Sequence, residues 1–393
     1  MRPTAIRKAD IDEARDVAAP AVGARFRRLT LTDFRSYERL DLELDGRPVA
    51  LSGPNGAGKT NLLEAISLLG PGRGLRHARL DELPRISGAG RWAVSARLAI
   101  DDDERALGVG GNGGDVDRRV CRIDGASASG PSAFADCLRL IWLTPAHDRL
   151  FMEGAGERRR FLDRMAMALD PAMARVSNDY ETAMRQRQRL LEENNRDDAW
   201  LCALEWQMAE NGVALAAARR DMAGALVAAS VGDDGAFPAA DIAIEGELES
   251  ALAYGPAAEV EEDFAARLKL NRRIDAEAGR AVAGPHRSDL LVTHRAKGRS
   301  ARLCSTGEQK ALLIGLVLAN ARALSLKPGG APLVLLLDEI AAHLDADRRA
   351  ALFDILDELA FQCFMTGTDA SLFDAWGARA QALEARDGAV FEI

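Results

Sequence analysis

The chain has 393 residues, of which 48% are hydrophobic, so it can form two or three domains with substantial cores. Its net charge of −9 argues against a protein that is basic throughout, as many nucleic-acid-binding proteins are. The five cysteines are scattered, and no apolar run approaches the ~20 residues that cross a bilayer, so we expect a cytoplasmic protein without a disulfide scaffold, zinc module or membrane contact.

The N-terminal part consists of an extension and two expected strands. Residues 1–24 are charged, rich in alanine and without the apolar core of a secretory signal, so we expect a disordered extension. Residues 25–32 and 39–44 alternate apolar and polar side chains, which predicts two strands around a turn at 33–38. Arg35 in this turn is a candidate contact to nucleotide or to the neighbouring loop; a surface arginine is the alternative.

A phosphate-binding loop follows the next expected strand. Residues 53–60 read G-x-x-x-x-G-K-T between an apolar run and a segment of helical spacing, which is the context this motif requires. Glycines let backbone N–H groups point at phosphate oxygens, and the helix N-terminus adds a favourable dipole. Lys59 is expected to bind the β- and γ-phosphates of ATP, and Thr60 to bind Mg²⁺. The expected nucleotide contacts of this segment are Gly53, Pro54, Asn55, Gly56, Ala57, Gly58, Lys59, Thr60 and Asn61.

The middle of the chain changes from strand-forming to helix-forming sequence. A Gly- and Arg-rich connector at 70–79 precedes several short strands, and a helical pattern then runs from about 157 to 230. The expected strands are 91–100, 104–109, 118–123 and 138–143, with turns at 110–114 and 124–125. Residues 232–256 have a mixed pattern, and a helix at 258–279 and a strand near 288–293 are expected after them.

The last third of the chain carries a second candidate anion site. The sequence STGEQK at 305–310 opens a long apolar helix expected at 307–326, which Ser305 is placed to cap. Such a loop at a helix N-terminus can bind an anion. One chain needs only one γ-phosphate site, so a second suggests that two chains share each nucleotide; an ordinary capped helix is the alternative. The candidate nucleotide contacts here are Ser305, Thr306, Gly307 and Glu308.

A strand that ends in two acids completes the expected site. Residues 333–337 are all aliphatic, which is typical of a strand buried on both faces, and Asp338 and Glu339 follow. Asp338 is expected to lie near the Mg²⁺ with Thr60. Glu339 can orient or deprotonate the attacking water, so Glu339, Lys59 and Asp338 are the expected catalytic residues.

The order of these motifs resembles that of the ATP-binding cassette (ABC) superfamily. Walker A at 53–60, a signature at 305–310 and Walker B at 333–339 are followed by a D-loop at 341–349 and a switch segment at 364–369. The last two segments add Asp345 and Thr366 as candidate nucleotide contacts, and a helix at 346–360 and a strand at 361–366 are expected around them.

Five segments resemble the RecF family more narrowly. They read LTLTDFRSYERLDLEL, LTPAHDRLFMEGAGERRRFLD, AGPHRSDL, STGEQKALLIGL and LLDEIAAHLDADRR, in order between residues 25 and 393. The resemblance implies an α/β fold: an ABC-type P-loop ATPase head, with a mixed sheet core and an antiparallel β subdomain, plus an inserted helical lid domain. It places the ATPase domain at 25–160 and 280–393 and the helical lid or dimerisation domain at 161–279.

The resemblance also implies a role in recombinational DNA repair. A family member is expected to dimerise on ATP, to be a weak, DNA-stimulated ATPase, and to help RecO and RecR load RecA. It is expected to bind double-stranded DNA, or single-strand/double-strand junctions at gaps, mainly through phosphates. Candidate DNA contacts are Arg73, Arg76, Arg79 and the arginine runs at 157–160 and 185–189, for which a solvated helix face is the alternative.

Some positions depart from the family pattern. The family's Pro-Glu-Asp-Leu is replaced here by Pro145-Ala146-His147-Asp148. The Ser-Glu pair of the D-loop is replaced by Ala342-His343. The loss of the D-loop serine removes a hydroxyl that can bridge two half-sites. Thr366 stands in a switch segment without the histidine of many transporters, in agreement with slow turnover. Of the histidines, His286 is the one that most merits a test.

Other functions remain open on the residues alone. An SMC-like head of another chromosome-maintenance complex has a similar ATPase, although positions 60 and 305 lie only 245 residues apart, too few for a long coiled coil. An ABC transporter subunit predicts a membrane partner and a switch histidine, and a P-loop kinase does not need the signature at 305–310. The protein could also be a non-catalytic scaffold, in which ATP sets only the oligomeric state. A scaffold predicts that Glu339→Gln leaves the rate of phosphate release unchanged.

Overall fold

The structure is a computed structural model, and it describes residues 24–100, 103–112, 119–193, 197–230, 236–326 and 331–393. The expected N-terminal extension therefore lies outside the described residues, except for Ala24, which begins the first strand. Residue 118 of the strand expected at 118–123 lies outside them too.

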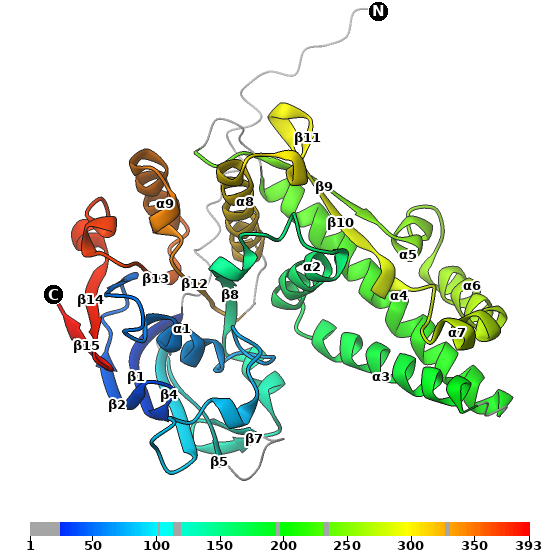
Figure 1. The fold of residues 1–393 in the computed structure, drawn as a ribbon, viewed down its shortest axis with the longest axis horizontal. Coiled ribbons are helices and arrows are strands. Elements are labelled where there is room, and N and C mark those ends of the chain that lie inside the picture. Colours follow the sequence, from blue (N-terminus) through cyan, green and yellow to red (C-terminus); the bar gives the residue numbers. More distant parts are fainter. Residues whose placement is uncertain (1–23, 101–102, 113–118, 194–196, 231–235, 327–330) are drawn as a thin grey trace, which may run out of the picture.

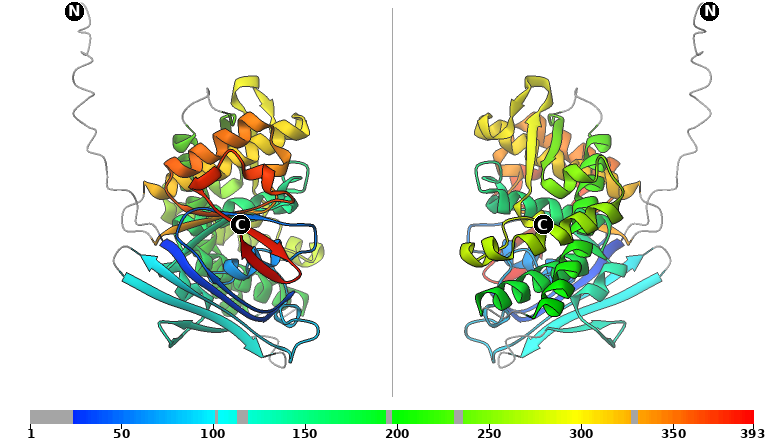
Figure 2. Two further views of the ribbon diagram at one scale, coloured as in Figure 1. Left: turned by 90° about the vertical axis from the view of Figure 1, so that its left-hand side faces the viewer. Right: turned by 90° about the vertical axis from the view of Figure 1, so that its right-hand side faces the viewer.

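An antiparallel sheet of six strands, in the order β2-β1-β4-β5-β6-β7, forms a layer of its own (Figures 1 and 2). Its strands are β1 (Ala24–Phe34), β2 (Tyr37–Glu43), β4 (Arg91–Ile100), β5 (Asp103–Asn112), β6 (Val120–Ile123) and β7 (Ala126–Ala128). The predicted alternation in β1 and β2 is confirmed, because Leu29 and Leu31 are buried while neighbours such as Arg28 are exposed.

A second six-stranded sheet, in the order β15-β14-β3-β13-β12-β8, is parallel except at its β15 edge. Its strands are β3 (Val49–Ser52), β8 (Arg139–Leu143), β12 (Leu333–Leu337), β13 (Gln362–Thr366), β14 (Gln381–Arg386) and β15 (Ala389–Glu392). β3, from the first part of the chain, lies between β14 and β13. It is parallel to β13, and β13 is parallel to β12, so the carboxyl ends of β3, β12 and β13 lie on the same side of the sheet. The phosphate loop and the Walker B acids are thereby brought together.

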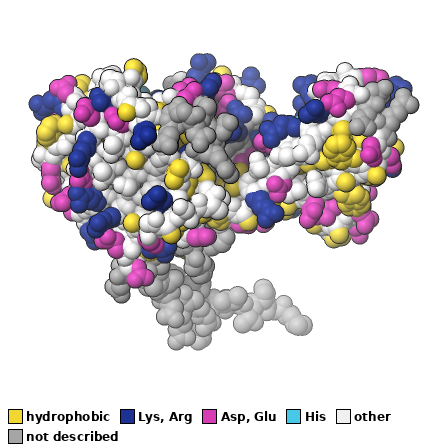
Figure 3. Space-filling model, turned by 90° about the horizontal axis from the view of Figure 1, so that it is seen from below, with side chains coloured by type: hydrophobic (Ala, Val, Ile, Leu, Met, Phe, Trp, Pro, Cys, Tyr) yellow, Lys and Arg dark blue, Asp and Glu magenta, His cyan; other side chains and the backbone are white. Residues whose placement is uncertain are grey.

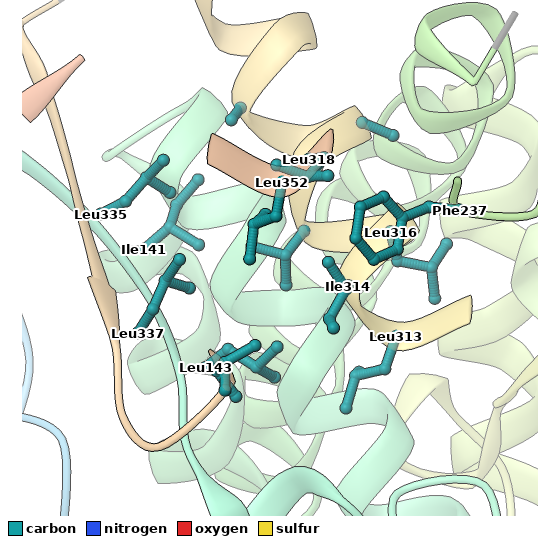
Figure 4. Close-up of a cluster of buried hydrophobic side chains, with 14 of the residues drawn as sticks. Ile141, Leu143, Phe237, Leu313, Ile314, Leu316, Leu318, Leu335, Leu337 and Leu352 are labelled. Atoms are coloured by element: carbon teal, nitrogen blue, oxygen red, sulfur yellow. The ribbon is translucent and has the colours of Figure 1, made fainter. Parts of the chain in front are cut away.

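The parallel sheet is covered on both faces, which explains its almost continuous apolar sequence. Alternate residues of β12 enter different cores: Leu335 and Leu337 pack with α8 (Thr306–Ser325), whereas Val334 and Leu336 pack with α1 (Lys59–Ser67) and the antiparallel sheet. Figure 4 shows the first of these cores, in which side chains of β8, β12 and α8 meet.

A helical region projects from one side of the molecule (Figure 1). It consists of α2 (Ala155–Leu169), α3 (Met173–Glu192), α4 (Asp198–Ala229), α5 (Glu247–Ala251), α6 (Ala257–Leu270) and α7 (Arg272–Ala278). A small sheet of β9 (Ala240–Glu245), β10 (Asp289–His294) and β11 (Arg299–Ser300) lies alongside, and α9 (Ala346–Glu358) packs near α8. The outer part has its own apolar core, built from α3, α4 and α6. No helix within the described residues has the length and apolar character that a membrane crossing requires.

Two predictions of elements were wrong, and some strands were missed. The turn expected at 110–114 is replaced as far as Asn112 by strand β5, because Gly111 lies flat against Trp92, where an added Cβ would be 2.8 Å from the indole Nε1. The single helix expected at 258–279 is interrupted at Asn271 to give α6 and α7. Strands β9, β14 and β15 were not predicted, although β14 pairs directly with β3.

Candidate nucleotide-binding site

The Walker A loop connects β3 to α1, as its sequence predicts, and its glycines are required by their surroundings. Gly53 (φ 146°) lies so close to the next strand that a Cβ would be 2.3 Å from the carbonyl oxygen of Ala385. Gly58 (φ 102°) lies under the side chains of Ser36 and Tyr37, and a Cβ would be 2.8 Å from both hydroxyl oxygens. Tyr37 also donates a hydrogen bond of 3.1 Å to the carbonyl of Gly58. Gly53 and Gly58 are therefore held in contacts that favour glycine.

Lys59, the first residue of α1, is buried at the centre of the loop. Its ammonium group donates hydrogen bonds to the carbonyl oxygens of Gly53, at 2.6 Å, and Pro54, at 3.0 Å. Burial lowers the pKa of Lys59, and the charges of Glu339 and Asp338 oppose this shift. The amine is thus positioned inside the curl of the loop, where a phosphate would lie.

Thr60 and Asp338 meet directly, although they are 278 positions apart. The Thr60 hydroxyl lies 3.0 and 3.1 Å from the two carboxylate oxygens of Asp338. On the other side, the Thr366 hydroxyl donates to Asp338 at 2.7 Å and accepts from the backbone N–H of Glu339 at 2.9 Å. The predicted Walker A, Walker B and switch residues therefore form one hydrogen-bonded group.

Glu339 has an unusual backbone for a residue with a side chain, with φ 57°. This left-handed conformation costs of order 1 kcal/mol and persists only where the surroundings hold it, here through the bond from Glu339 N–H to Thr366. It directs the chain away from the buried strand, and Glu339 lines a pocket together with Thr60 and Asp338.

Oxygen ligands suited to Mg²⁺ are present at this point. Mg²⁺ prefers one or two protein oxygens and completes its octahedral shell with waters and substrate phosphates. Thr60 and Asp338 supply such oxygens, and no group of three His, Cys, Asp or Glu side chains among the described residues forms a larger metal cluster. The donor set therefore fits Mg²⁺ held jointly with a nucleotide.

A buried carboxylate that sequence analysis missed supports the start of α1. Glu64, 1% exposed, accepts hydrogen bonds from Arg35 at 2.7 and 2.9 Å and from Arg76 at 2.9 Å. Arg76 also binds Asn61, whose amide donates to Ser36. Arg35 and Asn61 thus hold the walls of the loop, and whether they contact nucleotide stays a prediction. The position of Glu64 in the otherwise apolar stretch LLEAI was the one indication in the sequence that this acid is buried.

The signature segment is exposed and makes its own local structure. Ser305 caps α8: its hydroxyl accepts from Glu308 N–H at 3.4 Å, and Glu308 accepts from Ser305 N–H at 2.7 Å. The hydrogen bonds from Lys297 and from Ser305 lower the pKa of Glu308 to about 2. Asp345 caps α9 in the same way, accepting from Arg348 N–H at 2.8 Å. Within the described part of the chain, no hydrogen bond or ion pair joins Ser305–Glu308 to the Walker A loop.

A pocket of about 890 Å³ opens beside Thr60, Asp338 and Glu339. Its far wall is formed by the turn at 145–147 and by α2, including His147 and Arg164. Burial and the charge of Arg164 lower the pKa of His147 to about 4. His147 stands at a position that departs from the family pattern, and sequence analysis assigned it no role.

Several of the arginines proposed as DNA contacts have partners within the chain, and whether they bind DNA stays a prediction. Arg158 is paired with Asp289, and Arg159 donates to the carbonyl of Ser288. Arg187 is 1% exposed, so the run at 185–189 is not simply a solvated face.

His286, the histidine that most merited a test, lies within hydrogen-bond distance of the Tyr180 hydroxyl, at 2.7 Å, and of the Ala281 carbonyl. These contacts connect it to neighbouring segments of the fold.

Comparison with known proteins agrees with this geometry. Residues 25–388 match the family model described as RecF/RecN/SMC N terminal domain. The fold is similar to a solved structure of the recombination mediator protein RecF with ATP in the RecFOR pathway (TM-score 0.81, 22% identity, 96% of this chain and 100% of that chain covered). A Smc head domain from Pyrococcus furiosus gives a TM-score of 0.53 at 18% identity, covering 94% of this chain and 96% of its own. The fold and site thus define an ABC-type ATPase head of the RecF/SMC class, which confirms the predicted fold class.

The curated relatives narrow the class to one family. The chain is 53% identical over 370 residues to the DNA replication and repair protein RecF of Mesorhizobium japonicum, covering 92% of this chain and 96% of the relative. It is 52% identical over 359 residues to the RecF protein of Brucella suis, covering 90% and 93%. The chain belongs to the RecF family of DNA replication and repair proteins.

Proposed function

We propose that this protein is an ATP-dependent DNA-binding recombination mediator whose dimer is closed by ATP. The observation that carries the proposal is the separation of two half-sites in one chain. Lys59, Thr60 and Asp338 form one half-site for phosphate, while the signature at 305–308, the other half-site, lies exposed at the capped N-terminus of α8. A second copy of the chain supplies the missing half for each site.

The residues present support slow hydrolysis of ATP. Lys59 would exchange its loop carbonyls for the β- and γ-phosphates, and the loop N–H groups would hold their oxygens. Mg²⁺, held by Thr60 and through Asp338, would neutralise charge on the phosphates. Glu339 would orient the attacking water, with Thr366 fixing its backbone. The switch segment contributes a hydroxyl, which cannot carry charge as a histidine can, and this agrees with slow turnover.

DNA binding would follow closure of the dimer. Lys and Arg side chains are interspersed with Asp and Glu on the face seen in Figure 3, so this face shows no broad basic patch. Bringing two chains together would align their smaller basic groups, including Arg73 and Arg79, along duplex phosphates. We infer that the preferred DNA is double-stranded or gapped, that DNA stimulates the weak ATPase, and that RecO, RecR and RecA are the partners in the cytoplasm. Membership of the RecF family supports these inferences.

Mixing two inactive variants tests the shared site. Lys59→Ala removes the phosphate amine, and Ser305→Arg places a bulky side chain on the signature. Each variant alone should lose ATP turnover. In a mixed dimer, Walker A of the Ser305→Arg chain meets the intact signature of the Lys59→Ala chain, so part of the turnover should return on mixing.

The outcome separates the proposed function from a scaffold or a one-chain ATPase. No recovery on mixing, with both variants folded and dimeric, would contradict the shared site. If Glu339→Gln releases phosphate as fast as the unaltered protein, the nucleotide sets assembly only and the protein is a scaffold.

A further inference from the structure

Arg164, on α2, is a charged side chain without a carboxylate partner among the described residues. Its guanidinium lies over the ring of Trp142, at 5.1 Å, and near that of Phe161, at 5.8 Å. Glu157 favours the ionised guanidinium but is itself paired with Arg160. Arg164 is half-buried. An arginine held against aromatic rings in this way normally also has a carboxylate or phosphate to bind, because withdrawing an unpaired charge from water is costly.

The one polar partner of Arg164 that the structure gives is a neutral imidazole. Nη2 of Arg164 lies 2.8 Å from Nε2 of His147. A guanidinium only donates, so Nε2 is the accepting nitrogen of this contact. On its other side, Nδ1 faces the backbone N–H of Thr144, at 3.1 Å, as well as the hydroxyl and carbonyl oxygens of that residue. His147 therefore orients Arg164 without cancelling its charge.

The place of this cation connects it to the nucleotide site. Arg164 and His147 line the same pocket of about 890 Å³ that Thr60, Asp338 and Glu339 line. The other arginines of the pocket are engaged: Arg160 with Glu157, and Arg76 with Glu64. Glu153 adds one further acid to the wall. Arg164 is thus the arginine of this pocket that can accept a new anion without breaking an ion pair.

We propose that Arg164, oriented by His147, forms an inorganic phosphate subsite that receives the phosphate leaving the nucleotide site. The subsite rests on the proposed ATPase function, which supplies its ligand. Phosphate held here would delay release of the product. It would also act on α2, which packs between the ATPase sheets and the helical region and whose Arg158 is tied to Asp289 of β10.

The test uses inorganic phosphate itself, so it needs no turnover. Binding of phosphate to the full-length protein is measured by titration calorimetry with ADP and Mg²⁺ present. Arg164→Gln should raise the Kd for phosphate about ten-fold or more, as expected for the loss of a charge-assisted hydrogen bond. Arg164→Lys keeps the charge and should recover part of the affinity. Arg149→Gln removes the same charge from an exposed position outside the pocket, and should leave the Kd unchanged.

Three results would overturn the proposal. The first is an equal Kd for phosphate in Arg164→Gln and Arg149→Gln. The second is a loss of ATP affinity as large as the loss of phosphate affinity, which would place Arg164 in the nucleotide subsite. The third is weaker DNA binding with unchanged phosphate binding, which would assign Arg164 to a DNA phosphate. If the protein binds phosphate through Arg164 but does not hydrolyse ATP, the subsite stands and the proposed ATPase function fails.

Discussion

At the scale of the residue, the phosphate loop depends on space that a side chain would fill. Gly58 combines φ 102° with Ser36 and Tyr37 hydroxyls at 2.8 Å from an added Cβ, whereas Gly56 has φ 82° and open space around it. Gly58→Ala should lower the free energy of unfolding by about 1–3 kcal/mol and weaken ATP binding, because both the backbone and the contacts must shift. Gly56→Ala should cost about 1 kcal/mol, from backbone strain alone. Urea unfolding and nucleotide titration of the two variants measure the difference; equal losses would show that the Ser36 and Tyr37 contacts are unimportant.

His147 predicts a pH dependence of stability. Its folded-state pKa of about 4 lies below the ~6.5 of an unfolded histidine, owing to burial, to the charge of Arg164 and, less, to His77, whereas the hydrogen bond with the Thr144 backbone opposes the shift. The unfolded chain therefore binds more protons between these values, so this contribution is present above pH ~6.5 and is lost as pH falls toward 4. Between pH 7 and 4.5 the unaltered protein should lose about 1–3 kcal/mol more than His147→Asn in urea unfolding. Parallel losses in both proteins would contradict the assignment.

Sequence analysis identified the residues of the candidate site that belong to known motifs. Lys59, Thr60, Asp338 and Glu339 were found because the Walker motifs specify both halves of the site, even 278 positions apart. Glu64 was missed because its role depends on hydrogen bonds from Arg35 and Arg76, and Arg164 because its role depends on a contact with His147. No known motif predicts these pairs from their spacing in the sequence. Burial of a charge is a property of the packed molecule, and one sequence does not show it.

At the scale of the element, the helical region is held by a buried ion network that includes one member of a predicted basic run. Arg187 of α3 binds Glu205 of α4 at 3.0 Å, Asp275 of α7 at 2.7 Å and the carbonyl of Leu268 at 2.6 Å. All three charged residues are 2% exposed or less. The network links four helices, α3, α4, α6 and α7.

Breaking this network should destabilise the helical region. Arg187→Ala leaves two buried carboxylates without that partner and should cost about 3–5 kcal/mol, while Arg185→Ala, at an exposed position of the same run, should cost less than about 0.5 kcal/mol. Limited proteolysis and thermal unfolding compare the two. A solvated helix face would instead give two small effects of the same size.

The elements that sequence analysis predicted well have a strong local period. The helices within 157–230 and 307–326, and the buried strand at 333–337, follow from apolar spacing alone. Strands β9 and β14 were missed because they are stabilised by distant partners, β10 and β3, and not by their own pattern. The glycines of β5 suggested a turn because the sequence does not show the indole of Trp92 lying against them.

At the scale of the whole molecule, the two ends of the chain build one candidate nucleotide site, and the signature stands apart from it. Figure 1 shows α8 rising from the sheet on the side of the helical region, with its N-terminus exposed. Apolar side chains also gather at the far end of that region in Figure 3, but nothing in the structure shows what covers them. The predicted boundaries at 161 and 280 stay a prediction, because α2 and α4 share one core with the parallel sheet.

The most direct measurement of the central claim is binding of gapped duplex DNA by the Glu339→Gln protein, with ATP, with ADP and without nucleotide, while light scattering follows the mass. The account predicts a dimer with ATP alone, and salt-dependent DNA binding that is tighter in that state than in the other two. A monomer in ATP, or an ATP dimer that binds DNA no more tightly than the ADP form, would contradict it.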